Sequence, residues 1–217
     1  MRGQTVEKIV VHVLETATLV GLEDACRKVI APRYCERANV GPEARRLEAL
    51  GMGLLARYLL GVRADEDLTL GEYGKPSVAG APEFNLSNDA GLVVLAMGSV
   101  GGSAIGVDVE EVPGRYRHVE ELLARKYYDA DELAAIGDGS THEGRIAYAR
   151  AWTRREAILK AMGTGLAVDP RKHPEVLEGW ELQSRLLGDA VLTCAMREPF
   201  CMKLVPHNAS DLLDCAH

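Results

Sequence analysis

Two carboxylates two residues apart, and a carboxylate–ammonium pair four residues apart, are the groups in this chain best suited to chemistry. Asp108 and Glu110 lie in an apolar segment that alternates as a strand does, and Glu156 precedes Lys160 in a segment with helical spacing. Mg²⁺ takes oxygen ligands, often one or two carboxylates together with phosphate oxygens. A lysine ammonium stabilises charge that develops on such oxygens. Together these residue types could bind a divalent ion, hold a pyrophosphate and supply a base.

The acidic strand also has an ordinary explanation. Side chains two residues apart on a strand face the same way, so Asp108 and Glu110 share one face, and Val107 and Val109 share the other. A strand with its polar face in water has this same pattern, and Glu111 extends the acidic run. Both interpretations stay open at the level of sequence.

The helical pair is equally ambiguous. A Glu four residues before a Lys is common on helix surfaces, where it contributes about 0.2–0.5 kcal/mol. Trp152 lies one turn before Glu156, and an aromatic residue, an acid and a base on one stripe could instead line a cleft. Gly163 and Gly165 follow, either as a helix C-cap or as a place where backbone approaches a ligand.

Two further polar segments precede the acidic strand. Residues 84–89 contain Asn, Ser and Asp, which favour turns, so we expect a turn before the apolar strand 92–97. Lys75 follows a glycine and precedes Pro76, which is typical of a loop with a solvated lysine.

These segments alternate with predicted helices and strands along the whole chain. We expect helices at 21–30, 42–60, 117–126, 129–136 and 142–162, and strands at 8–14, 92–97, 104–112, 180–187, 190–196 and 201–205. A Gly-rich break at 98–102 predicts two α+β subdomains, residues 1–100 and residues 101–217.

Composition limits the class of protein. The chain has 217 residues, 47% of them hydrophobic, which is enough for a substantial core. No apolar run approaches the roughly 18 residues that span a bilayer, and the N-terminus lacks a signal-peptide pattern, so we expect a cytoplasmic protein without a membrane partner. A net charge of −7 disfavours nucleic acid as a partner. The five cysteines include no C-x-x-C pair, so neither a disulfide framework nor a zinc site is indicated.

Four motifs occur in a characteristic order. They are Gly-Lys-Pro at 74–76, Phe-Asn-Leu-Ser at 84–87, Gly-Val-Asp-Val-Glu at 106–110 and Trp-x-x-Arg-Glu-Ala-x-x-Lys-Ala-x-Gly-x-Gly-Leu at 152–166. This set resembles the 4′-phosphopantetheinyl transferase superfamily, and within it the larger, single-chain (Sfp-like) type. The resemblance implies two similar α+β subdomains packed as a pseudo-dimer, with the metal site on the second.

The resemblance also implies an activity. Such enzymes move the 4′-phosphopantetheine arm of coenzyme A onto a serine of an apo carrier protein and release 3′,5′-adenosine bisphosphate. We therefore expect a Mg²⁺-dependent transferase, with Mn²⁺ as an alternative ion, that acts as a monomer. Acyl, aryl and peptidyl carriers of fatty-acid, polyketide and nonribosomal peptide synthesis all remain open as the protein partner.

Residue roles follow from the matching motifs. Asp108, Glu110 and Glu156 would hold the metal ion, and Lys160 would pair with phosphate oxygens. Glu156 would also be the base that accepts the proton of the carrier serine. The resemblance thus makes Glu156, Lys160 and Asp108 the catalytic residues.

Coenzyme A would lie along the remaining motif residues. Lys75 and Pro76 would flank its adenine end, and Ser87 and Asn88 would contact phosphate. Arg45 would reach the 3′-phosphate, through a looser match of the helix that contains it.

The motifs depart from the family at two positions. Asn88 stands where the family usually has His, and it cannot become cationic. Arg155 stands where the family usually has Lys, which keeps the charge and changes its geometry. Asn88 leaves open a non-catalytic relative that binds coenzyme A or a carrier protein. Without the resemblance, the residues also allow an α+β interaction protein with a solvated acidic strand.

Overall fold

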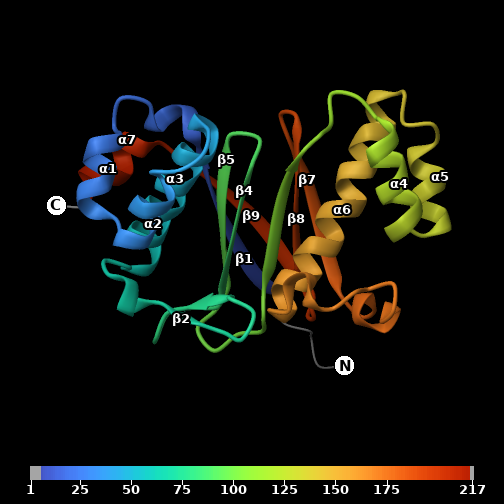
Figure 1. The fold of residues 1–217 in the computed structure, drawn as a ribbon. Helices are drawn as coiled ribbons and strands as arrows, with labels where there is room; N and C mark the ends of the chain where they lie inside the picture. Colours follow the sequence, from blue (N-terminus) through green and yellow to red (C-terminus); the bar gives the residue numbers. More distant parts are fainter. Residues whose placement is uncertain (1–5, 216–217) are drawn as a thin grey trace.

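The computed structural model describes residues 6–215 and consists of two β-sheets flanked by helices (Figure 1). The strands are β1 (Glu7–Glu15), β2 (Thr69–Leu70), β3 (Pro76–Ser77), β4 (Phe84–Asp89), β5 (Leu92–Met97), β6 (Gly106–Glu111), β7 (Glu181–Leu187), β8 (Ala190–Met196) and β9 (Phe200–His207). The helices are α1 (Glu23–Val29), α2 (Pro32–Arg37), α3 (Glu43–Leu60), α4 (His118–Tyr127), α5 (Ala130–Ile136), α6 (His142–Met162) and α7 (Ala209–Asp214).

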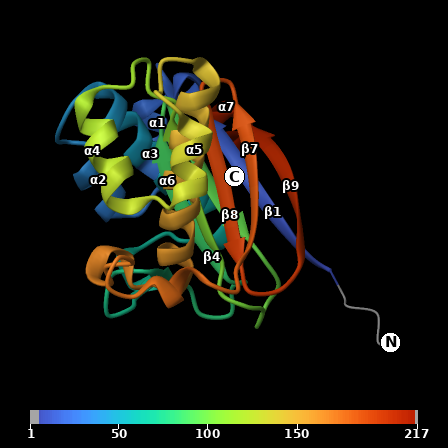
Figure 2. The ribbon, with the colours of Figure 1, turned by 90° about the vertical axis from the view of Figure 1, so that its right-hand side faces the viewer.

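The two main sheets form the middle of the molecule. One has the strand order β4-β5-β1-β9 and the other the order β6-β8-β7, while β2 and β3 form a small separate hairpin. Helices α1, α2, α3 and α7 lie on the outer side of the first sheet, and α4, α5 and α6 lie beyond the second (Figures 1 and 2). The predicted α+β fold is confirmed, with a sheet covered by helices on its outer side in each half.

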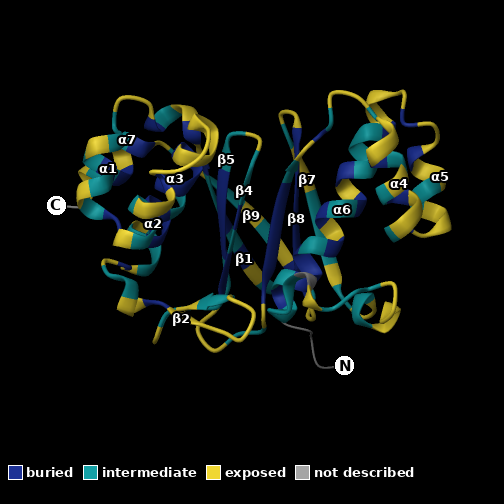
Figure 3. Ribbon diagram, viewed as in Figure 1, coloured by how far each residue is buried: buried dark blue, intermediate teal, exposed yellow. Residues whose placement is uncertain are grey.

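The core between the two sheets is continuous. Ile9 of β1, Val94 of β5, Val107 of β6 and Leu192 of β8 all belong to this cluster and are fully buried. Figure 3 shows β5, β6 and β8 as largely buried, whereas β7 and β9 are more exposed. Strands buried on both faces carry near-continuous apolar runs, as residues 92–97 and 190–196 do.

The end of the chain returns to the first sheet. Strand β9 pairs in parallel with β1, opposite β5, and α7 places Leu212 in the same apolar cluster as Leu50 of α3. The subdomain boundary at residue 100 stays a prediction, but the last strand and helix lie with the N-terminal half. Periodicity cannot reveal this, because it does not specify which strand is the partner.

Most elements lie close to their predicted ranges, with one clear exception. The predicted turn at 84–89 is wrong, since this segment is strand β4, and the turn lies at Ala90 and Gly91, both with positive φ. The reason is alternation: Phe84 and Leu86 pack on the helical side, while the polar residues between them face β6. Helices α2 and α7 and the short strands β2 and β3 have no counterpart among the predicted elements.

None of the helices in the described part of the chain is both long and apolar enough to cross a membrane.

Candidate active site

A glycine brings the two elements of the site together. Strand β6 packs directly against α6, and a Cβ atom at Gly106 would lie 1.8 Å from the carbonyl oxygen of Ala157. Only a residue without a side chain allows this approach. Because the helix lies so close, its inner face meets the face of β6 that carries Asp108.

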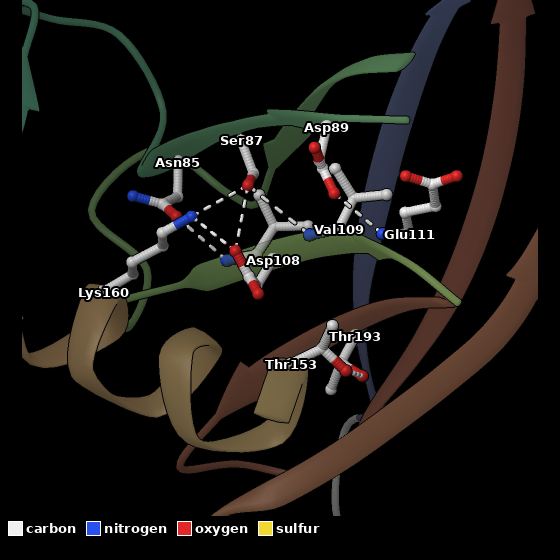
Figure 4. Close-up of polar contacts among 10 residues, drawn as sticks. Asn85, Ser87, Asp89, Asp108, Val109, Glu111, Thr153, Lys160 and Thr193 are labelled. Carbon is white, nitrogen blue, oxygen red and sulfur yellow. Dashed lines mark hydrogen bonds and ion pairs between the residues drawn. The ribbon is translucent and has the colours of Figure 1, made fainter. Parts of the chain in front are cut away.

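Asp108 is the centre of the site. Its side chain is 3% exposed, and its Oδ1 accepts hydrogen bonds from Lys160 Nζ at 2.6 Å and from Ser87 Oγ at 3.0 Å. Lys160 Nζ also donates to Ser87 Oγ at 2.8 Å. Figure 4 shows the three side chains converging from β6, α6 and β4. The alternative of a solvated strand is therefore wrong for Asp108, and Lys160 does more than form a surface helix pair.

Two more carboxylates share this environment. The pKa of Glu110 is raised to about 8, chiefly by burial and then by the nearby charges of Asp108 and Asp89, while Lys160 opposes the rise. Burial and the Asp108 charge also raise the pKa of Glu156. Burial raises the pKa of Asp108 itself, and the Lys160 ammonium opposes this effect. Asp108 thus lies close enough to Glu110 and to Glu156 to repel both, and among the described residues only Lys160 forms an ion pair within this group.

This donor set suits a hard divalent cation. Asp108 Oδ2 is buried and has no hydrogen-bond partner among the described residues, although a buried carboxylate oxygen normally has one. Within residues 6–215, no three acidic, His or Cys side chains are already gathered as a finished metal site. The unpartnered oxygen of Asp108 and the mutual repulsion with Glu110 and Glu156 nevertheless fit Mg²⁺, whose binding would offset both.

Lys75 and Pro76 lie beside the same helix. They line a cavity of about 180 Å³ together with Lys160, Asn85 and Gly163. The ammonium of Lys75 donates to two backbone carbonyls, Ile105 at 3.2 Å and Ala161 at 3.1 Å, and burial lowers its pKa. The interpretation of Lys75 as a solvated loop residue is therefore wrong. Gly163 has φ of 70° and ends α6 as a C-cap.

Arg45 and Asn88 lie in a second cavity, of about 520 Å³, between α3 and β4. Asn88 faces away from Ser87, as alternation along a strand requires. Its Nδ2 donates to Glu48 Oε2 at 2.8 Å. Asp89 also lines this cavity, so Arg45 shares it with two carboxylates.

Arg155 points away from the site, because it lies next to Glu156 on α6 and occupies a different face. Its guanidinium forms a bidentate pair with Glu132 of α5, at 2.7 and 2.5 Å, and stacks over the ring of Tyr128. The exchange of Lys for Arg at this position thus affects helix packing and not the Asp108 cluster.

Sequence reasoning missed three polar residues near the site. Asn85 and Asp89 accept hydrogen bonds from the backbone of β6, and Glu48 binds Asn88. The alternation of Asn, Ser and Asp at 85, 87 and 89 is the signal that could have identified a strand with one polar face.

Comparison with known proteins agrees with this geometry. Residues 104–200, which include β6, α6 and the Asp108 cluster, match the model of the 4′-phosphopantetheinyl transferase superfamily. The chain is 34% identical over 99 residues to 4′-phosphopantetheinyl transferase AcpT of Salmonella typhimurium, covering 45% of this chain and 50% of that one. It is 32% identical over 138 residues to AcpT of Escherichia coli K12, covering 62% and 66%.

A further relative is the 4′-phosphopantetheinyl transferase Sfp of Bacillus subtilis, 22% identical over 147 residues, with 67% of this chain and 60% of Sfp covered. The chain thus spans between half and two thirds of the length of these curated relatives. By its segment 104–200 and by these relatives, the chain is similar to the 4′-phosphopantetheinyl transferase superfamily.

Proposed function

We propose that this protein transfers the 4′-phosphopantetheine arm of coenzyme A to a serine of an apo carrier protein, with Mg²⁺, and releases 3′,5′-adenosine bisphosphate. The observation that carries the proposal is the contact of Lys160 with Asp108 and Ser87, next to a buried Asp108 oxygen that lacks a partner. An ammonium group beside a carboxylate that can bind a metal ion would stabilise the negative charge that develops when a pyrophosphate is attacked.

Each residue of the cluster has a chemical task. Asp108, with Glu110 and Glu156, would hold Mg²⁺, which supplies Lewis-acid stabilisation of the pyrophosphate charge. Lys160 reaches the same point and neutralises charge on phosphate oxygens. Glu156 would also accept the proton of the carrier serine. Because a carboxylate beside Mg²⁺ is a weak base, its position next to the serine would carry part of this step.

The two cavities support a path for coenzyme A on either side of Ser87. The cavity beside Lys75 and Pro76 includes Lys160, so a nucleotide end placed there leaves its phosphates next to the cluster. The larger cavity offers Arg45 to a further phosphate group. Acyl, aryl and peptidyl carriers are all candidates for the protein partner, and the expected monomer and cytoplasmic location stay predictions.

The test is intact-protein mass spectrometry. The full chain is incubated with coenzyme A, Mg²⁺ and a panel of apo carrier proteins, and we expect at least one carrier to gain one phosphopantetheine group. A carrier with its acceptor serine changed to alanine, the Asp108→Asn enzyme, and a chelator should each abolish the gain. Because Asn has the shape of Asp, Asp108→Asn removes the charge with little change of packing.

The alternative of a non-catalytic relative gives a different outcome. Such a protein would bind coenzyme A by calorimetry and modify no carrier in the panel. A protein that neither binds coenzyme A nor modifies a carrier would contradict both functions.

A further inference from the structure

Three side chains of β4 hydrogen-bond to the backbone of β6. Asn85 Oδ1 accepts from Val107 N at 2.9 Å, and each later contact falls two residues further along both strands (Figure 4). The other two acceptors are Ser87 Oγ, from Val109 N at 3.4 Å, and Asp89 Oδ2, from Glu111 N at 2.8 Å. We call these three contacts the side-chain ladder.

The side-chain ladder takes the place of the backbone hydrogen bonds that would join β4 to β6 in a single sheet. Strands β4 and β6 are edge strands of different sheets, and in the described part of the chain no backbone pairing joins them. Alternate residues of a strand direct their N–H groups to opposite sides, so the open edge of β6 presents a row of donors. Because Val107 and Val109 are buried, an unpaired donor at either position would be costly. The ladder satisfies these donors and fixes the register of β6 against β4.

The three contacts differ in what else their side chains do. The hydroxyl of Ser87 is shared with Lys160 and Asp108, and its contact to β6 is the longest. The Asp89 contact is exposed to solvent. The Asn85 contact is buried and neutral, and Figure 4 shows its amide nitrogen turned away from β6. Asn85 is therefore the member whose oxygen serves only to hold the strand.

We propose that Asn85 is a positioning residue for the transfer reaction. By holding Val107 N, it sets where β6 lies against β4, so that Asp108, the next residue, meets Ser87 and Lys160. The proposal rests on the proposed function for its kinetic consequence and on the hydrogen bonds alone for its structural one.

The test compares two variants of Asn85 in the full chain. Asn85→Leu keeps the size and removes the acceptor. Asn85→Ser replaces the amide by a hydroxyl acceptor. Ser87, two residues further along β4, shows that a serine hydroxyl can accept a hydrogen bond from the β6 backbone. Ile136→Val, in the separate apolar cluster around α5, serves as the control for a general loss of stability.

We expect Asn85→Leu to lower kcat by about 100-fold, as a misplacement of about 1 Å does. Because Asn85 also lines the cavity beside Lys75, the measurement is kcat at saturating coenzyme A, where a weaker KM has no effect. Asn85→Ser should recover most of kcat, and Ile136→Val should keep it. A wild-type kcat in Asn85→Leu, or an equal loss in Ile136→Val, would overturn the proposal.

Two readouts need no activity. Hydrogen exchange of the Val107 amide should be faster in Asn85→Leu than in the wild type and in Asn85→Ser. The Lys160 ammonium should give a slowly exchanging ¹⁵N signal in the wild type and lose it in Asn85→Leu. If the wild type modifies no carrier, the proposed function fails, and these two readouts alone decide the positioning role. If Asn85→Leu does not fold, Asn85→Ser decides: an unprotected Val107 amide with full kcat would contradict the proposal.

Discussion

At the scale of single residues, the site depends on a buried carboxylate that is only half satisfied. Asp108 has one oxygen held by Lys160 and Ser87 and the other without a partner among the described residues. Removal of one member of a buried ion pair leaves the other charge uncompensated. Changes at Lys160 should therefore affect both catalysis and stability.

Lys160→Ala should lower kcat/KM by about 10- to 150-fold, since a hydrogen bond from a charged group contributes about 1.5–3 kcal/mol. Lys160→Arg should retain part of the activity, because the charge stays and the geometry changes. The measurement is steady-state transfer to an apo carrier. Lys172→Ala, at an exposed lysine beyond α6, is the matched control. Unchanged turnover in Lys160→Ala would mean that the Asp108 contact has only a structural role.

Glu48→Gln should tighten coenzyme A binding. The change keeps an acceptor for Asn88 and removes a negative charge from the cavity that Arg45 lines. Removal of one repulsive charge at about 4 Å in a solvated cavity corresponds to about 1 kcal/mol, or about fivefold in affinity. Calorimetry should show the gain for coenzyme A but not for dephospho-coenzyme A, which lacks the 3′-phosphate. An equal gain for both ligands would place the 3′-phosphate elsewhere.

At the scale of elements, the approach of α6 to β6 and the pairing of β1 with β9 determine where the functional groups lie. The first depends on Gly106 and the second brings His12 and His207 together, with 2.7 Å between their ring nitrogens. Neither contact is a property of one element alone.

Gly106→Ala should destabilise the protein by about 1–3 kcal/mol or more, because the new methyl group has no room beside the Ala157 carbonyl. Transfer activity should fall as α6 moves away from Asp108. Gly114→Ala is the control, since its φ is not positive and a Cβ atom there meets nothing within 4 Å. Denaturant unfolding of both variants provides the measurement, and equal midpoints would contradict the close packing.

The His12–His207 pair should make the fold sensitive to acid. Burial and the neighbouring His207 lower the pKa of His12 to about 4, from an ordinary value of 6.5, and burial lowers the pKa of His207 as well. The unfolded chain then binds protons more readily than the folded one. Stability from this pair is complete above about pH 6.5 and is lost as the pH falls towards 4.

The measurement is the free energy of unfolding at pH 7, 5.5 and 4.5 for wild type and for His12→Gln. We expect a shallower pH dependence in the variant, because one proton fewer is taken up on unfolding. Identical slopes would show that His12 titrates normally.

At the scale of the whole molecule, the C-terminal strand and helix, β9 and α7, pack with the N-terminal half. The first strand lies between β5 and β9, and α7 packs with the helices of the N-terminal half. Residues 1–100 alone would leave one edge of β1 open and would lack the apolar side chains of α7.

Leu212→Ala should therefore weaken the N-terminal half, although it lies near the C-terminus. Leu212 is 2% exposed, so its truncation should cost about 2–5 kcal/mol. Hydrogen exchange should accelerate in α1–α3 more than in α4–α6. Leu186→Ala, at a leucine that is 46% exposed on β7, should change little. Equal acceleration in both sets of helices would mean that the halves unfold as one unit, and no change in α1–α3 would favour independence of residues 1–100.

Local patterns in the sequence were enough for most of the elements and for the motif residues. Apolar spacing over 42–60 predicts α3 because a helix repeats every 3.6 residues, and that period needs no partner. Alternation around Asp108 predicted correctly that Asp108 and Glu110 share a face, opposite the buried Val107 and Val109. The same rule predicts a strand with one polar face at residues 84–89, as the structure has it, whereas residue types that favour turns led to the wrong prediction there.

Only the tertiary structure decided which of these residues meet. The contacts of the site join residues that are 21 to 86 positions apart in the chain. They are the hydrogen bonds of Asp108 with Ser87, of Lys75 with two backbone carbonyls, and of Asn88 with Glu48. The side-chain ladder and the return of β9 to β1 likewise depend on which edges face each other. Periodicity encodes the face on which a side chain lies, whereas packing of the two sheets selects the partner on the other side.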